Sequence, residues 1–333
     1  MENLQMAIYQ QESDMGHQTL LEGIVNSIPR INISSLTPQA FLEQYQKLGR
    51  PVVITGLLQT ECDWNLDYLC ENLGKREVLL RFYGRERYKQ DKRQWKDIGS
   101  GVEPRSMLFA QYAELLRNQK AREDDIYLAR SPLKGTPLAE AAQSLNTVGE
   151  RLNLGKLTRG LSLWVGPTDH REALHYDPVD VVLMQLHGAK HVVLFPPSET
   201  HNLYPFPLYV HLRYGLKLRC WCSQVYPTRP DFKAFPRLRE ALQHKHEVKL
   251  APGEVLYLPA GWWHEVTTVG QEMVCSVNQT WSVHPSSRAL LSWNRWRIFL
   301  GVTCALPHTL LSILLAMCSS ERKQKLSKIG RLV

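Results

Sequence analysis

The chain has 333 residues, of which 44% are hydrophobic and 22% are charged, and its 20 Gly and 19 Pro are ordinary numbers for this length. This composition excludes disordered, collagen-like and low-complexity proteins, and it predicts a globular chain with one large core. Because 40 Lys and Arg stand against 32 Asp and Glu, the net charge is +8, and we expect anionic partners such as nucleic acid, acidic protein segments or small anions.

The N-terminal residues and the cysteines bear on the cellular compartment. No basic region followed by an apolar stretch opens the sequence, so no secretory signal is predicted. The seven cysteines contain no CxxC pair, which predicts free thiols in a reducing compartment. We therefore expect a cytoplasmic protein, or a nuclear one in a eukaryote. Residues 1–27 are polar and aperiodic, and we expect a mobile leader there.

Residues 28–160 alternate between helical and strand patterns and are predicted to form an N-terminal α/β part. Thr37 and Pro38 supply a cap and a first-turn proline for a helix that ends at Gly49. Ser106 is expected to cap a second long helix. Further elements are expected as strands at 51–56, 78–82 and 126–128 and as a short helix at 67–73.

Residues 161–285 are dense in short apolar runs separated by Gly and Pro, which is typical of an antiparallel sandwich or barrel. Residues 203–246 interrupt this pattern with irregular, proline-rich sequence, and we expect a long insertion or lid. The predicted strands cover residues 161–165, 179–186, 190–195, 247–250, 255–258, 264–269 and 273–281.

Residues 286–333 are predicted to form C-terminal helices. The run from Ile298 to Ser320 carries no formal charge, follows two tryptophans and precedes a cluster of Lys and Arg. It is long enough to cross a bilayer, which takes about 20 residues. An apolar hairpin buried in a second subunit would look the same, and we favour this homodimer because nothing else in the chain suggests a membrane. Membrane association of 298–318 is the alternative.

Two histidines and one aspartate are the strongest candidates for chemistry. His175 and Asp177 lie two residues apart at the predicted start of a strand, so their side chains point to the same face. His264 follows 89 positions later, after a second strand. Two imidazoles and one carboxylate match the facial triad of non-haem Fe(II) sites. Taken alone, this spacing arises often by chance in a chain with 12 histidines.

The surrounding motifs resemble the Jumonji C (cupin-like) Fe(II)- and 2-oxoglutarate-dependent oxygenases. They are similar above all to the small hydroxylases, such as the asparaginyl hydroxylase that acts on hypoxia-inducible factor and the tRNA wybutosine-pathway hydroxylase. The resemblance spans about residues 28–285. It rests on the segments Gly49–Gly56, Trp164–Pro167, Leu174–Pro178, Gln185–Lys190, Leu194–Pro197 and Pro252–His264.

The resemblance implies a double-stranded β-helix (jelly-roll) core over 161–285, and it assigns roles to single residues. His175, Asp177 and His264 are expected to be catalytic residues that bind iron. Lys190 is expected to pair with the distal carboxylate of the cosubstrate 2-oxoglutarate, and Tyr127 and Asn278 are expected to lie beside it. The implied reaction uses dioxygen, hydroxylates a C–H bond and releases succinate and CO2.

Two positions depart from the family pattern. The family usually has Thr or Ser three residues before the first ligand histidine, where this chain has Glu172. It commonly has Asn six residues after that histidine, where this chain has Val181. An inward Glu172 would oppose a dicarboxylate, so these two positions motivate an alternative in which the chain is a catalytically degenerate cupin-like binding protein. A sugar isomerase or small-molecule dioxygenase with four metal ligands ranks last, because only one distant histidine follows.

The substrate is expected to be a peptide or protein side chain. Residues 81–96 hold seven basic residues interleaved with aromatic ones, an arrangement that also suits single-stranded RNA, so an RNA hydroxylase is the alternative. We favour the peptide because no RNA-binding motif accompanies this segment. Histone demethylation ranks lower, because no chromatin-reading cysteine/histidine array is present.

Overall fold

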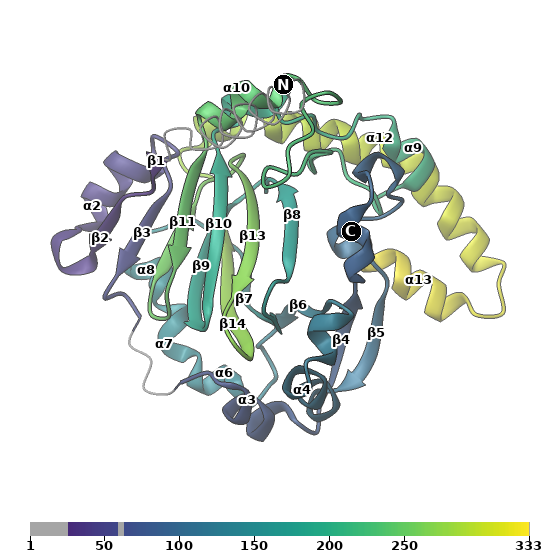
Figure 1. The fold of residues 1–333 in the computed structure, drawn as a ribbon, viewed down its shortest axis with the longest axis horizontal. Helices are drawn as coiled ribbons and strands as arrows, with labels where there is room; N and C mark the ends of the chain where they lie inside the picture. Colours follow the sequence, from purple (N-terminus) through teal and green to yellow (C-terminus); the bar gives the residue numbers. More distant parts are fainter. Residues whose placement is uncertain (1–25, 59–62, 333) are drawn as a thin grey trace, which may run out of the picture.

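The structure is a computed structural model that describes residues 26–58 and 63–332. Two β-sheets form its centre, helices cover one face, and a helical arm projects from one side (Figure 1). The expected fold is confirmed as a mainly β, jelly-roll core with N-terminal α/β elements and C-terminal helices. Most pairings are antiparallel, and the parallel ones join β1 (Asn26–Ser27) to β11 (His246–Leu250) and β2 (Arg30–Asn32) to β3 (Val52–Thr55).

The smaller sheet has the order β1-β11-β10-β13-β8 and the larger one β2-β3-β12-β9-β14-β7-β6-β4-β5. Besides the strands already given, the smaller sheet contains β8 (Arg171–His175), β10 (Ala189–Phe195) and β13 (Trp263–Val269). The larger sheet contains β4 (Glu77–Phe82), β5 (Pro104–Leu108), β6 (Ile126–Pro132), β7 (Leu157–Pro167), β9 (Asp180–His187), β12 (Val255–Leu258) and β14 (Met273–Trp281).

Alternation along the strands divides the apolar side chains between two layers. Strand β9 turns Val181 and Leu183 into the space between the sheets, where they pack with residues of β10 and β11 of the smaller sheet and of the neighbouring β12. Its residues Val182 and Met184 point the other way, into a larger cluster that helices cover. These helices are α3 (Leu66–Leu73), α4 (Phe109–Arg117), α5 (Lys120–Glu123), α6 (Leu138–Ala141), α7 (Gln143–Asn146) and α8 (Val148–Arg151). One end of the barrel interior is therefore filled with apolar side chains.

The N-terminal elements differ from the sequence prediction in three places. The helix expected to run to Gly49 is α2 (Pro38–Phe41), continued by a π-helical turn over Leu42–Gln46. The cap expected at Ser106 is wrong, because this residue pairs with Leu79 inside β5 and the helix α4 begins at Phe109. Residues 1–25 of the expected leader lie outside the described residues, and Asn26–Ser27 pair with β11.

Residues 203–246 fold over the outer side of the smaller sheet. They contain α9 (Val210–Tyr214) and α10 (Leu238–Gln243) and bury Leu203, Val225 and Leu238 against β8 and β13. A short bridge joins Cys222 to His175, so this insertion borders the end of β8. The described cysteines are all free, in agreement with the prediction, and Cys62 lies outside the described residues.

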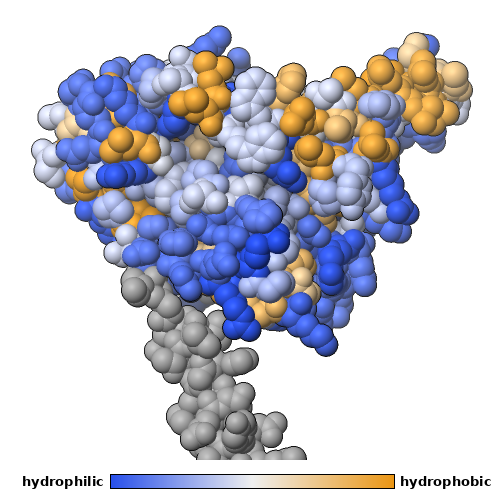
Figure 2. All heavy atoms as spheres, turned by 90° about the horizontal axis from the view of Figure 1, so that it is seen from above, coloured by the Kyte–Doolittle hydropathy of each residue, from blue (hydrophilic) through white to orange (hydrophobic). Residues whose placement is uncertain are grey.

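The C-terminal residues form α11 (Ser286–Leu290), α12 (Trp293–Met317) and α13 (Arg322–Gly330). Arg288 of α11 forms an ion pair with the buried Asp180, which also accepts a hydrogen bond from Tyr257. Helix α12 is long and apolar enough to cross a membrane, and only 11% of an apolar 18-residue stretch within it is buried. Its exposed side chains form an apolar face on the projecting arm (Figure 2).

Candidate active site

The structure brings the three predicted metal ligands together. His175 is the last residue of β8, Asp177 follows it by two residues, and His264 is the second residue of β13. The two histidines lie directly opposite each other in the antiparallel pair of β8 and β13. One ligand atom of each of the three residues lies within 4.8 Å of the others. The pairing of two strands therefore places residues 89 positions apart at one site.

Backbone carbonyl groups fix the orientation of both imidazoles. His175 Nδ1 lies 2.8 Å from the carbonyl oxygen of Ala173, and His264 Nδ1 lies 3.1 Å from that of Trp262. Burial and the neighbouring His175 lower the pKa of His264 to about 4, so its ring is neutral near pH 7. Both rings therefore keep Nε2 free as a metal donor, and the set of two nitrogens and one carboxylate fits a divalent iron ion.

Lys190 reaches across the barrel from β10 to the opposite sheet, where its Nζ donates a hydrogen bond to Ser276 Oγ on β14. Its side chain is almost fully buried. Burial lowers the pKa of Lys190 to about 8. Among the described residues, no carboxylate lies within 4 Å of this ammonium group, so the site fits an anion that would balance its charge.

The two other predicted cosubstrate residues come from the larger sheet. Asn278 lies two residues after Ser276 on β14, and its Oδ1 is buried without a hydrogen-bond partner. Tyr127 on β6 is buried, and its ring stacks on that of His170 with 3.7 Å between the centroids. Ser276 was missed in the sequence, although its spacing of two from Asn278 on a predicted strand places both on one face.

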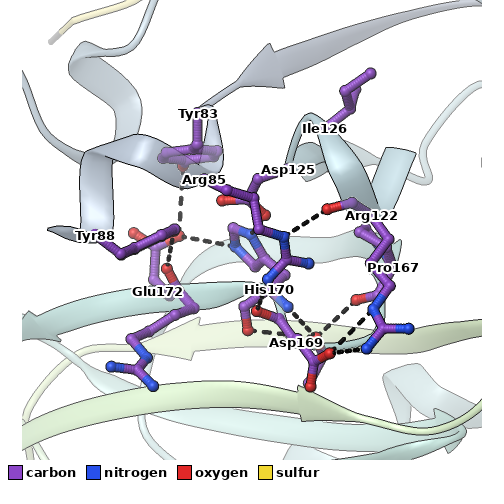
Figure 3. Close-up of polar contacts among 12 residues, drawn as sticks. Tyr83, Arg85, Tyr88, Arg122, Asp125, Ile126, Pro167, Asp169, His170 and Glu172 are labelled. Carbon is purple, nitrogen blue, oxygen red and sulfur yellow. Dashed lines mark hydrogen bonds and ion pairs between the residues drawn. The ribbon is translucent and has the colours of Figure 1, made fainter. Parts of the chain in front are cut away.

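Glu172 points toward the same side as His175 because β8 is irregular. The register shifts between the pairs His264–His175 and Val266–Glu172, so Glu172 and His175 share one face although they lie three positions apart. Tyr83 Oη donates to Glu172 Oε2 over 3.5 Å, and His170 Nε2 lies 3.9 Å from the same oxygen (Figure 3). Burial raises the pKa of Glu172, but His170 and the nearby His175 outweigh burial and lower it to about 2.

Behind Glu172, His170 also contacts Asp125 through Nδ1 at 2.8 Å, with both side chains buried (Figure 3). Burial lowers the pKa of His170, but the two carboxylates outweigh it and the net shift is upward. This imidazole between Asp125 and Glu172 was not predicted, since Asp125 precedes β6, His170 precedes β8, Glu172 lies in β8, and the three share no sequence motif.

Val181 belongs to the apolar cluster between the sheets, where it packs beside Leu183 and Val192. The position that commonly carries an asparagine in the resembled family is therefore part of the hydrophobic core here. The polar lining of the site comes instead from Lys190, Ser276 and Asn278.

Comparison with known proteins agrees with this geometry. Residues 38–287 match the family described as cupin-like domain. The chain is 30% identical to lysine-specific demethylase JMJ30 of Arabidopsis thaliana over 75% of its own length and 54% of the relative's. It is 26% identical to lysine-specific demethylase 8 of Xenopus tropicalis over 77% and 53% of the two chains, respectively.

A third relative is covered more completely. The chain is 25% identical to the human tRNA wybutosine-synthesizing protein 5 over 78% of its own length and 79% of the relative's. In contrast, it spans about half of the length of the two demethylases. The family match covers most of the chain and includes every residue of the site, and the matched relatives include JMJ30 and JmjC domain-containing protein D of Dictyostelium discoideum. The chain therefore belongs to the cupin-like domain family, among its JmjC-type members.

Proposed function

We propose that the protein is an Fe(II)- and 2-oxoglutarate-dependent oxygenase that hydroxylates a protein side chain. One observation carries this proposal: two imidazoles with free Nε2 atoms and one carboxylate converge within 4.8 Å beside a buried lysine that lacks a counter-ion among the described residues. A metal ion and a dicarboxylate would together satisfy both features.

Each residue has a separate task in this proposal. His175, Asp177 and His264 would hold the iron on one face and leave its other positions open. Lys190 would bind the distal carboxylate of 2-oxoglutarate, with Ser276 orienting the ammonium group. Bound iron and 2-oxoglutarate supply the oxidising chemistry, in which dioxygen hydroxylates a C–H bond while 2-oxoglutarate becomes succinate and CO2. The strand pairing of β8 and β13 keeps the ligands rigid during this reaction.

The relatives differ in the substrates that their names indicate, which are lysine residues for two and tRNA for the third. A protein side chain is favoured here because the aromatic residues that RNA would need for stacking are engaged inside the protein. Trp95 is buried, and Tyr88 donates its hydroxyl to the carbonyl of Arg171. An RNA hydroxylase is the alternative. A second alternative, motivated by Glu172, is a binding protein without catalytic activity.

The first test is an anaerobic titration of the protein with Fe(II) and 2-oxoglutarate. A weak visible charge-transfer band of the iron–2-oxoglutarate chelate is expected in the wild type. It should disappear in His264→Ala and persist in His201→Ala, which changes an exposed histidine outside the site. A folded wild-type protein without the band would overturn the oxygenase and favour the binding protein.

A further inference from the structure

Three arginines from separate parts of the chain lie on segments that border the candidate site. Arg81 lies on β4 directly opposite Tyr127 of β6, so it shares the face that carries this site residue. Arg130 lies at the far end of β6. Arg219 lies in the insertion three residues before Cys222, which bridges to His175. All three are partly buried.

The backbone of β6 is distorted where it carries Arg130. This residue has a φ of 56°, and the register of β6 with β7 shifts between Leu128 and Ser131. A non-glycine residue in this left-handed region is strained, and such strain is concentrated at functional sites. A bulge re-aims the side chain that it carries. Burial and the neighbouring Arg159 lower the pKa of Arg130 to about 10, and Asp177, Arg219 and Arg81 also act on its charge.

These three side chains lack a direct ion-pair partner in the part of the chain that the structure describes. Within the described ranges, no carboxylate lies within 4 Å of the guanidinium groups of Arg81, Arg130 or Arg219. Arg81 Nε is buried without a hydrogen-bond partner. Arg219 donates only to the carbonyl groups of Leu216 and Leu332, each over 3.2 Å. Partly buried cations of this kind are costly unless an anion completes them.

We propose that Arg81, Arg130 and Arg219 form an anion-binding site beside the metal triad, which takes an acidic side chain of a peptide substrate close to the hydroxylated residue. This inference rests on the proposed function. Guanidinium groups bind carboxylates through two parallel hydrogen bonds, which fixes the orientation of the bound group as well as its charge. A substrate held in this way would present one neighbouring residue to the metal centre.

The rest of the basic segment favours a peptide over RNA as the anion. Four of its six other cations are already paired or buried: Arg87 pairs with Asp97, Arg93 pairs with Asp91, Lys89 pairs with Glu86, and Lys92 is buried. An extended phosphate backbone would therefore find few free contacts along residues 81–96, and bases would find few free aromatic faces. A compact site of three arginines suits one or two carboxylates.

The test measures the binding of fluorescent peptide pools by anisotropy. One randomised pool is enriched in Asp and Glu, a second pool carries Asn and Gln at the same positions, and an oligouridine RNA serves as the third probe. The acidic pool should bind the wild type most tightly. Arg130→Gln and Arg81→Gln should each weaken its binding about tenfold or more. Arg50→Gln, which changes an exposed arginine whose side chain forms no hydrogen bond or ion pair with the described residues, should leave binding unchanged.

Equal binding of the acidic and neutral pools would overturn the inference. A loss of affinity in Arg50→Gln as large as that in Arg130→Gln would also overturn it. If oligouridine bound more tightly than the acidic pool and lost affinity in the arginine variants, the ligand of this site would be RNA and not a peptide. The iron–2-oxoglutarate band is measured in the same variants and should persist, and its loss in Arg130→Gln would reassign the arginines to the cosubstrate. Absence of the band in the wild type would contradict the proposed function alone, because peptide binding is read out independently.

Discussion

Lys190 is the residue whose charge links cosubstrate binding to pH. Its burial lowers its pKa from 10.5 to about 8, so the ammonium form that pairs with a carboxylate predominates only below that pH. Above it, binding must be accompanied by uptake of a proton. The affinity for 2-oxoglutarate should therefore fall by about tenfold per pH unit once the pH exceeds the pKa.

Calorimetric titration of the metal-loaded protein with 2-oxoglutarate, from about pH 7 to about pH 9.5, measures this dependence. Lys190→Met should bind 2-oxoglutarate weakly at every pH, with no dependence on the protonation of this site. An affinity in the wild type that stays constant over the whole range would show that Lys190 does not hold the cosubstrate.

Glu172 places a negative charge near a site that we expect to take a dianion. His170 and Tyr83 hold this carboxylate, and its pKa of about 2 keeps it ionised at neutral pH. Removing the charge in Glu172→Gln should therefore strengthen 2-oxoglutarate binding, by roughly threefold to tenfold. Asp169→Asn is the matched control, because this carboxylate pairs with Arg122 at the surface. A weaker affinity in Glu172→Gln would instead make Glu172 part of the binding site.

At the scale of elements, the close approach of β6 and β7 fixes the position of Tyr127. A Cβ atom at Gly166 would lie 2.0 Å from the Cδ2 atom of the Tyr127 ring. Gly166→Ala should therefore displace the ring from its stack on His170, lower the free energy of unfolding by about 1–3 kcal/mol, and weaken 2-oxoglutarate binding. Gly160→Ala on the same strand meets open space and should change neither quantity. Urea unfolding and calorimetry measure the two effects, and wild-type values for Gly166→Ala would contradict this account.

The same glycine explains one limit of prediction from sequence. Gly166 and Pro167 look like a turn, but both lie inside β7, which runs from Leu157 to Pro167. The strands β12 and β14 were predicted with their observed bounds, because their apolar runs end at strong turn residues. The cap expected at Ser106 was wrong because residues 104–108 form a strand that pairs with β4. This strand depends on a tertiary contact that the local sequence does not show.

The site was predictable where its residues belong to short sequence motifs. His175 and Asp177 share a short motif, and Lys190 follows at a fixed spacing on the next hairpin. His170, Asp125 and Tyr83 were not predictable, because a network of side chains from different strands leaves no periodic pattern. The inward position of Glu172 depends on a shift of register between β8 and β13, which a single sequence does not reveal.

For the whole molecule, the largest feature without a partner in the described part of the chain is the apolar face of α12. Small residues, Gly301 and Ala305, pack against the body, whereas Leu310 and Leu314 on the other side are about 60% exposed. Helix α13 folds back alongside α12, and Lys328 of α13 pairs with Glu103 at 2.7 Å. The start of α12, through Asn294, and helix α13 are both held by the body of the protein, and this return of the chain opposes a membrane crossing in this conformation (Figure 1).

We propose that a second copy of the chain covers this face, because two antiparallel helices from each subunit can bury it in a four-helix arrangement. Sedimentation velocity should give a dimer for the wild type and a monomer for the double variant Leu310→Glu with Leu314→Glu, since a buried carboxylate without a partner is costly. The iron–2-oxoglutarate band should persist in this variant. Leu212→Glu, which changes an exposed leucine of α9, should remain dimeric. If the wild type were a monomer and floated with phosphatidylserine vesicles, the apolar face of α12 would bind a lipid surface and not a second copy.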